Sequence, residues 1–345
     1  MKVSDAQAAA ARWVAEHAAA SPDFAGAFLS GSTTWLPPDA ELPVGSDVDV
    51  MMVTNHDEAP PKPGKFVHDG VLLEATCLAW QDLSSPEHVL GSCHLAGSFR
   101  KDTILADPTG RLAELRDRAM GEYAREPWVR LRCENTERRI VDGLGRLDVS
   151  RPPHERVTAW MFPAGVTTHV LLTAGLRNPT VRLRYSAARD LLHAYGMPQL
   201  HEQLLELHGS VGLTRERVEH HLRAMTAVFD ATVPLARTPY FFASDITERS
   251  RPIAVDGSHE LIARGRHREA VFWIAATYAR CLTLLAADAP AEQARFAPGF
   301  EELTADLGVA DGPALERRAR EVLAFLPRLR DAAEAIIREN PGITA

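Results

Sequence analysis

The order of apolar and polar positions divides the chain into a strand-rich first third and a helix-rich remainder. An Ala-rich segment predicts a first helix, which ends before Pro22. Short runs that are apolar or alternate between apolar and polar residues predict four strands. The helix is expected at 4–19, and the strands at 25–29, 47–53, 71–80 and 103–106. The Pro- and charge-rich segment 56–65 predicts a loop, whereas 86–98 has an ambiguous pattern.

From Leu112 onward, Ala, Leu, Arg and Glu recur in long segments separated by Pro and Gly, which indicates helices. Expected helices are 111–124, 128–147, 154–176, 181–195, 198–208, 214–230, 258–287 and 312–338. A chain of 345 residues is long enough to form two hydrophobic cores. We therefore expect an α+β protein, with a small mixed sheet in a domain over 1–120 and an all-α domain over 121–345.

Composition and charge narrow the classes of protein that remain. Hydrophobic residues make up 46% of the chain and charged residues 24%, as in an ordinary globular protein. The formal net charge of −8 argues against a nucleic-acid partner, because proteins that bind nucleic acid usually carry a basic excess. The four cysteines are scattered, and no long apolar window lacks charges. We therefore expect a cytoplasmic location and no membrane span.

The first candidate for chemistry is the pair Asp47 and Asp49 at the start of the strand DVDVMMV. Residues two apart in a strand project from the same face, so these carboxylates are expected side by side. Val48 and Val50 would then point into the core. Two neighbouring carboxylates repel each other unless a divalent cation lies between them, and hard oxygen ligands favour Mg²⁺.

Two further features add to this pair. Gly31 and Ser32 follow an apolar strand, where a glycine lets the backbone approach a phosphate and a serine hydroxyl can donate to it. Glu74 is the one acid in the apolar strand VLLEATCLAW, where a carboxylate is costly unless it is paired or binds metal. Three carboxylates on adjacent strands could hold two Mg²⁺ ions, an arrangement suited to transfer of a nucleotidyl group.

The segments SGS, GSDVDVMMV and LLEATCLAW resemble the DNA polymerase β-like nucleotidyltransferase superfamily, and most closely its bacterial aminoglycoside and lincosamide nucleotidyltransferases. The resemblance covers about residues 20–120. It implies that Ser32 contacts the β- and γ-phosphates of a nucleoside triphosphate, with ATP the expected donor. It also implies that Asp47 and Asp49 are metal ligands and that Glu74 is a third carboxylate, acting as metal ligand, general base or both. The acceptor would be the hydroxyl of a small molecule such as an aminoglycoside-like natural product.

The sequence departs from the family between Ser32 and Asp47, where 14 residues stand in place of a shorter spacer. This 33–46 insert carries Trp35, which could stack on the base of the nucleotide or pack on its own domain. Candidate contacts for the triphosphate are Arg100 and Lys101, which precede the last expected strand. A second group is Arg264 and Arg268, at the start of the apolar stripe of helix 258–287.

Other functions remain open. The fold could serve as a nucleotide-binding regulatory module without transfer, or as a nucleotidyltransferase that modifies a protein. The sequence also leaves open whether Glu74 acts as the general base or whether a carboxylate of the helical domain, or of the partner chain in a homodimer, takes that role.

Overall fold

The computed structural model describes residues 1–18, 21–43 and 45–345. The chain forms two compact units, Met1–Arg132 together with Pro341–Ala345, and Cys133–Asn340. Their boundary lies inside helix α4 (Glu126–Gly145), later in the chain than the expected division at 120/121. Ala19, the expected end of the first helix, and Val44, in the 33–46 insert, lie outside the described residues.

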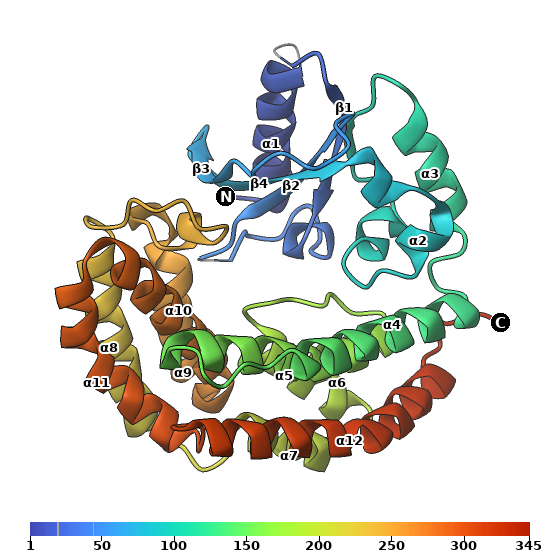
Figure 1. The fold of residues 1–345 in the computed structure, drawn as a ribbon. Helices are drawn as coiled ribbons and strands as arrows, with labels where there is room; N and C mark the ends of the chain where they lie inside the picture. The colour runs from blue at the N-terminus through green and yellow to red at the C-terminus, as the bar shows by residue number, and fades with distance from the viewer. Residues whose placement is uncertain (19–20, 44) are drawn as a thin grey trace. The chain divides into compact units, whose positions relative to one another are not determined.

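A five-stranded mixed sheet forms the centre of the first unit, in the order β3-β4-β2-β1-β5 (Figure 1). The strands are β1 (Phe24–Ser30), β2 (Val48–Thr54), β3 (Gly64–His68), β4 (Val71–Ala79) and β5 (Ile104–Ala106). Strands β2 and β4 run parallel, and the other neighbouring pairs are antiparallel. The prediction of a mixed sheet followed by helices is thus confirmed.

Apolar side chains cover both faces of this sheet. On one face, helix α1 (Val3–Ala18) packs residues at helical spacing, including Ala6, Ala10 and Trp13, against the buried side chains of β2 and β4. On the other face, α2 (Pro86–Leu90) and α3 (Arg111–Met120) pack over β1 and β2. Figure 1 shows α1 and the pair α2 and α3 on opposite sides of the sheet.

Strand β3 corrects the prediction of a loop over 56–65, because residues 64 and 65 already belong to the strand. Asp69 and Gly70 have φ angles of 48° and 75° and connect β3 to β4 as a tight hairpin. An Asp-Gly pair between two strands is a strong hairpin signal, since both central residues of the favoured turn need positive φ. The prolines that suggested a loop all precede the strand.

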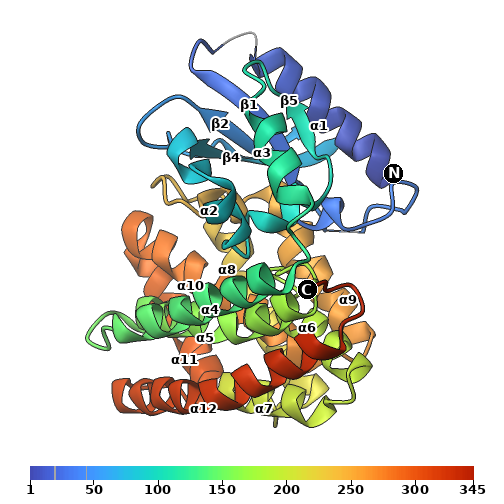
Figure 2. The ribbon, with the colours of Figure 1, turned by 90° about the vertical axis from the view of Figure 1, so that its right-hand side faces the viewer.

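The second unit is helical, and within it α12 packs along α5 (Figure 2). Beyond α4, the helices are α5 (Pro153–Ala174), α6 (Arg184–Ala194), α7 (Pro198–His208), α8 (Arg215–Thr232), α9 (Gly257–Ala263), α10 (His267–Asp288), α11 (Pro290–Asp306) and α12 (Gly312–Glu339). The prediction of a single helix over 258–287 is wrong, because the chain leaves the helical path at Gly265, where φ is 72°. Helix α11 was not predicted.

Helix α10 contains a long apolar window. By length and composition it is the one helix among the described residues that could cross a membrane, but 83% of its apolar window is buried inside the structure. Its burial against α5, α8 and α11 accounts for this composition, because a helix enclosed on all sides is apolar all round.

Candidate functional site

A row of polar residues crosses four strands of the sheet at one level. Lys65 on β3 pairs with Glu74 on β4, Glu74 pairs with Asp49 on β2, and Asp49 pairs with Ser30 on β1. Directly paired residues project from the same face of a sheet, and Asp47 joins them two residues before Asp49. The register therefore brings the three expected carboxylates together, while Val48 and Val50 are fully buried on the α1 face.

Two lysines that the sequence analysis did not single out hold two of these carboxylates. The Nζ atom of Lys65 lies 2.8 Å from Oδ2 of Asp47 and also contacts Oε2 of Glu74. The Nζ atom of Lys62 lies 2.7 Å from Oε1 of Glu74. Burial alone would raise the pKa of Glu74, but the two ammonium groups outweigh it and lower this pKa to about 2. Glu74 is therefore an anion at neutral pH, with a lysine on each of its oxygens.

Asp49 differs from its neighbours because it makes no hydrogen bond or ion pair with another described residue. Burial, followed by the charges of Asp47 and Glu74, raises the pKa of Asp49 well above its ordinary value. The side chain lies against Gly31, where an added Cβ atom would stand 1.8 Å from Oδ2 of Asp49. Only glycine leaves room for this carboxylate, and the φ angle of 62° at Gly31 also favours glycine.

These donors fit a divalent cation. Asp49 offers two carboxylate oxygens without a hydrogen-bond partner among the described residues, and Asp47 stands two residues before it with Oδ2 on Lys65; carboxylate oxygens are the hard ligands that Mg²⁺ prefers. Within residues 1–18, 21–43 and 45–345, no group of three or more His, Cys, Asp or Glu side chains is arranged to ligate a metal ion. Asp47 and Glu74 each direct one oxygen at Lys65.

The backbone after β1 turns sharply beside Asp49. The hydroxyl of Thr34 donates to the carbonyl of Gly31 at 2.9 Å, which closes a short 3₁₀ turn over Ser32–Thr34. Ser98, on the 3₁₀ segment Ala96–Arg100, donates to the hydroxyl of Ser30 at 3.0 Å. The hydroxyl of Ser32 makes no hydrogen bond to another described residue. That this hydroxyl contacts a phosphate stays a prediction.

The two expected cations before β5 have different surroundings. Arg100 donates to the carbonyl of Thr34 at 2.6 Å and to that of Gly97 at 3.1 Å, and its guanidinium lies 3.8 Å from the ring centre of Trp35. Trp35 thus packs on its own unit, the second of the two alternatives for this residue. Lys101 is partly buried and makes no ion pair with another described residue. Burial and the nearby Arg100 lower its pKa.

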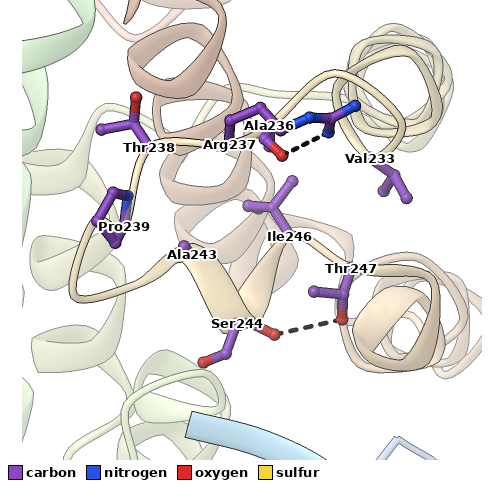
Figure 3. A pocket seen from close by; sticks show the side chains of 9 residues that line it. All are labelled: Val233, Ala236, Arg237, Thr238, Pro239, Ala243, Ser244, Ile246 and Thr247. Carbon is purple, nitrogen blue, oxygen red and sulfur yellow. Dashed lines mark hydrogen bonds between the residues drawn. The ribbon is translucent and has the colours of Figure 1, made fainter. Parts of the chain in front are cut away.

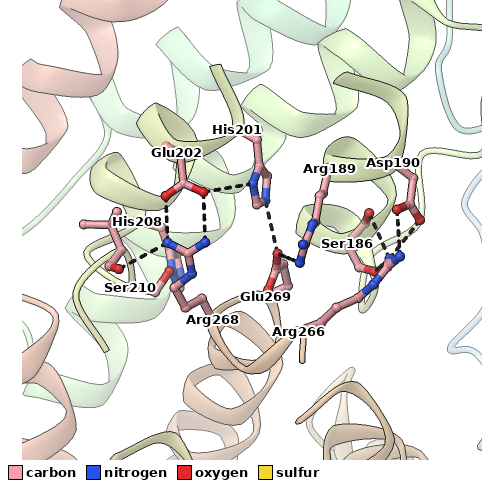
Figure 4. Close-up of polar contacts among 11 residues, drawn as sticks. Ser186, Arg189, Asp190, His201, Glu202, His208, Ser210, Arg266, Arg268 and Glu269 are labelled. Carbon is pink, nitrogen blue, oxygen red and sulfur yellow. Dashed lines mark hydrogen bonds and ion pairs between the residues drawn. The ribbon is translucent and has the colours of Figure 1, made fainter. Parts of the chain in front are cut away.

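Both cations expected on the helical unit have protein partners, and Figure 4 shows that of Arg268. Arg268 forms two hydrogen bonds to Glu202, at 2.7 and 2.9 Å, which tie α10 to α7. Arg264 pairs with Glu260 one helical turn earlier. Because Gly265 ends α9, Arg264 does not extend the apolar stripe of α10, and the pattern that singled it out was wrong. Whether either residue contacts a triphosphate stays a prediction.

A cavity of about 350 Å³ in the helical unit is lined by residues between 233 and 247. Figure 3 shows the side chains that line it. Its polar lining comes from Arg237, Thr238, Ser244 and Thr247. The Oγ atom of Ser244 is buried and has no hydrogen-bond partner. The lining contains no carboxylate, so this cavity offers space and hydrogen-bonding groups but no acid or base.

The lysines were missed because the segment that carries them reads as a loop. The signal that could have found them is Asp69-Gly70, which fixes a hairpin and thereby places Lys65 opposite Glu74. No protein-family model matches the chain, and a comparison with curated proteins finds no match. A function is therefore inferred from the carboxylate row itself.

Proposed function

We propose that the chain is a Mg²⁺-dependent nucleotidyltransferase of the DNA polymerase β-like type. It would transfer a nucleoside monophosphate, with ATP the expected donor, to a hydroxyl of a small molecule. The acceptor oxygen forms a bond to the α-phosphorus, the bond from that phosphorus to the bridging oxygen breaks, and pyrophosphate leaves. The observation that supports this function is the side chain of Asp49, which has no hydrogen-bond or ion-pair partner among the described residues and lies against Gly31, where an added Cβ atom would displace it.

Each residue of the site has a place in this reaction. Asp47 and Asp49 would hold the metal, which, when bound, neutralises phosphate charge and lowers the pKa of the acceptor hydroxyl. The Ser32 hydroxyl and the turn after Gly31 would donate to the phosphates. Lys101 would add a charged contact, because it follows the segment that bonds to Ser30 and makes no ion pair with another described residue.

The reaction also needs a general base that accepts the proton of the acceptor hydroxyl. A carboxylate with a pKa of about 2, held by two lysines, binds a proton poorly at neutral pH. This property favours the alternative in which a carboxylate of the helical domain, or of a partner chain in a homodimer, takes the proton. Glu74 would then keep the lysines in place.

The acceptor is proposed to be a hydroxylated small molecule, such as an aminoglycoside-like natural product. A net charge of −8 is compatible with a cationic acceptor. The cavity between residues 233 and 247 provides a volume of about 350 Å³ for such a molecule in the helical unit. Nucleic acid and membrane surfaces are not expected partners, and the cytoplasm is the expected location.

Calorimetric binding of a non-hydrolysable ATP analogue, with and without Mg²⁺, tests this function. We expect Mg²⁺-dependent binding by the wild type and its loss in Asp47→Asn/Asp49→Asn. The matched control is Asp102→Asn/Asp117→Asn, which removes two acids that pair with Arg116 elsewhere in the same unit. Pyrophosphate release in an acceptor screen would follow.

The outcomes separate the alternatives. Binding without turnover on any acceptor would favour a regulatory module, and turnover only on a protein would favour a protein-modifying enzyme. Absence of binding to ATP, GTP, CTP and UTP analogues by folded wild type would refute the proposal.

A further inference from the structure

Lys65 occupies the space between two of the three carboxylates in the row. Its ammonium group contacts Asp47 and Glu74 at once, and only 6% of its side chain is exposed. The position is fixed by the fold, because Lys65 on β3 is the direct antiparallel partner of Glu74 on β4. The side chain therefore enters the site from the sheet itself, and not from a loop that could place it elsewhere.

The oxygens that remain for a metal are consequently few. Both oxygens of Glu74 contact lysines, and one oxygen of Asp47 contacts Lys65. Among the described residues, no hydrogen bond or ion pair occupies Oδ1 of Asp47 or either oxygen of Asp49, which is the second residue of β2 and lies two positions after Asp47. These oxygens suffice for one divalent ion, whose other ligands would be water and phosphate.

The net charge of the site also supports one divalent ion. Three carboxylates with two divalent ions carry one net positive charge. Three carboxylates with two ammonium groups and one divalent ion carry the same charge. Lys65 and Lys62 thus supply the positive charge of a second ion, and Lys65 does so from a position between two carboxylates, where that ion would bind.

We propose that this site binds one divalent ion, held by Asp47 and Asp49, and that the Lys65 ammonium takes the place of a second one. This inference rests on the proposed function. It gives one divalent ion where the sequence predicts two. Lys65 is then a positioning residue, and it sets the number of metal ions without being a ligand.

Counting Mn²⁺ tests this inference. The probe is Mn²⁺ added to the full chain with a non-hydrolysable ATP analogue, followed by calorimetry and electron paramagnetic resonance. Two ions in one site lie roughly 3.5–4 Å apart, close enough for their spins to couple. We expect one ion and an uncoupled spectrum for the wild type, and two ions with a coupled spectrum for Lys65→Gln.

Lys62→Gln is the matched control, because it removes an equal charge from Glu74 and leaves Lys65 between the carboxylates; it should bind one ion. If Lys65→Gln does not fold, Lys65→Arg keeps the charge in place and should also bind one ion. Two ions in the wild type or in Lys65→Arg, or one in folded Lys65→Gln, would overturn the role of Lys65 while leaving the proposed function intact. Wild type that binds neither Mn²⁺ nor the analogue would instead overturn the proposed function.

Discussion

Replacing Gly31 by alanine tests the geometry of the site through one methyl group. The added Cβ atom would stand 1.8 Å from Oδ2 and 2.6 Å from Cγ of Asp49. Real Cβ atoms do not approach heavy atoms closer than 3.0 Å, so the carboxylate must move by more than an ångström. The substitution therefore displaces one proposed metal ligand while every ionisable group is kept.

The size of the effect follows from two contributions. Gly31 has φ 62° and ψ −157°, a region that is almost confined to glycine, and alanine there costs roughly 1–3 kcal/mol of folding free energy. Displacing a ligand by about 1 Å can reduce the function of a site by roughly a hundredfold. We expect Mg²⁺-dependent affinity for the ATP analogue to fall by at least about tenfold.

The matched control is Gly70→Ala in the same unit. Gly70 has φ 75°, but a Cβ atom added there meets nothing within 4 Å. Urea unfolding should show that both variants lose stability, whereas calorimetry should show that only Gly31→Ala loses nucleotide affinity. Unchanged affinity in Gly31→Ala would refute the reasoning that glycine is needed at 31 to seat Asp49.

Three further predictions concern Lys101, Arg268 and His208, which have contrasting surroundings. Lys101→Ala should lower affinity for the ATP analogue by about tenfold or more, since a charged hydrogen bond contributes roughly 1.5–3 kcal/mol, with little change in unfolding. Arg268→Ala should instead lower stability by less than about 1 kcal/mol, because its pair with Glu202 is partly exposed, and leave affinity within about twofold. An affinity loss in Arg268→Ala equal to that in Lys101→Ala would show a triphosphate contact on α10. In the helical unit, burial lowers the pKa of His208 to about 3, so the unfolded chain takes up a proton below about pH 6.5 that the folded chain resists. Its contribution to stability is present above that pH and falls by up to about 1.4 kcal/mol per unit as the pH drops towards 3. Urea unfolding between pH 6 and 4 gives the free energy of unfolding at each pH. This free energy should decrease less steeply with falling pH in His208→Gln than in wild type, and an equal decrease in both would contradict the prediction.

The sequence predicted the parts of the site that depend on local periodicity. Alternation at Asp47 and Asp49 gives their common face without any knowledge of the fold, and the acid in an apolar strand marks Glu74. The segment SGS marks the turn beside them, although the contact between Gly31 and Asp49 needs two strands to be paired in register.

Features that depend on long-range pairing were beyond the reach of periodicity. Lys65 lies in a Pro-rich stretch, and its role appears only when β3 is placed against β4. Arg268 reads as a cation available for phosphate until Glu202, on another helix, is brought beside it. The helix break at Gly265 was obscured because apolar residues recur at helical spacing on both sides of it.

Residues 341–345 belong to the sheet-bearing unit although the helical unit precedes them in the chain. The amide of Glu126 donates to the carbonyl of Thr344 at 2.7 Å, and the amide of Thr344 donates to the carbonyl of Ala124 at 3.0 Å. During synthesis on a ribosome, the carboxylate row would be assembled early, while the hydrogen bonds at Ala124 and Glu126 would wait until more than two hundred further residues had been added. The sheet-bearing unit is thus completed only after the helical unit has been synthesised.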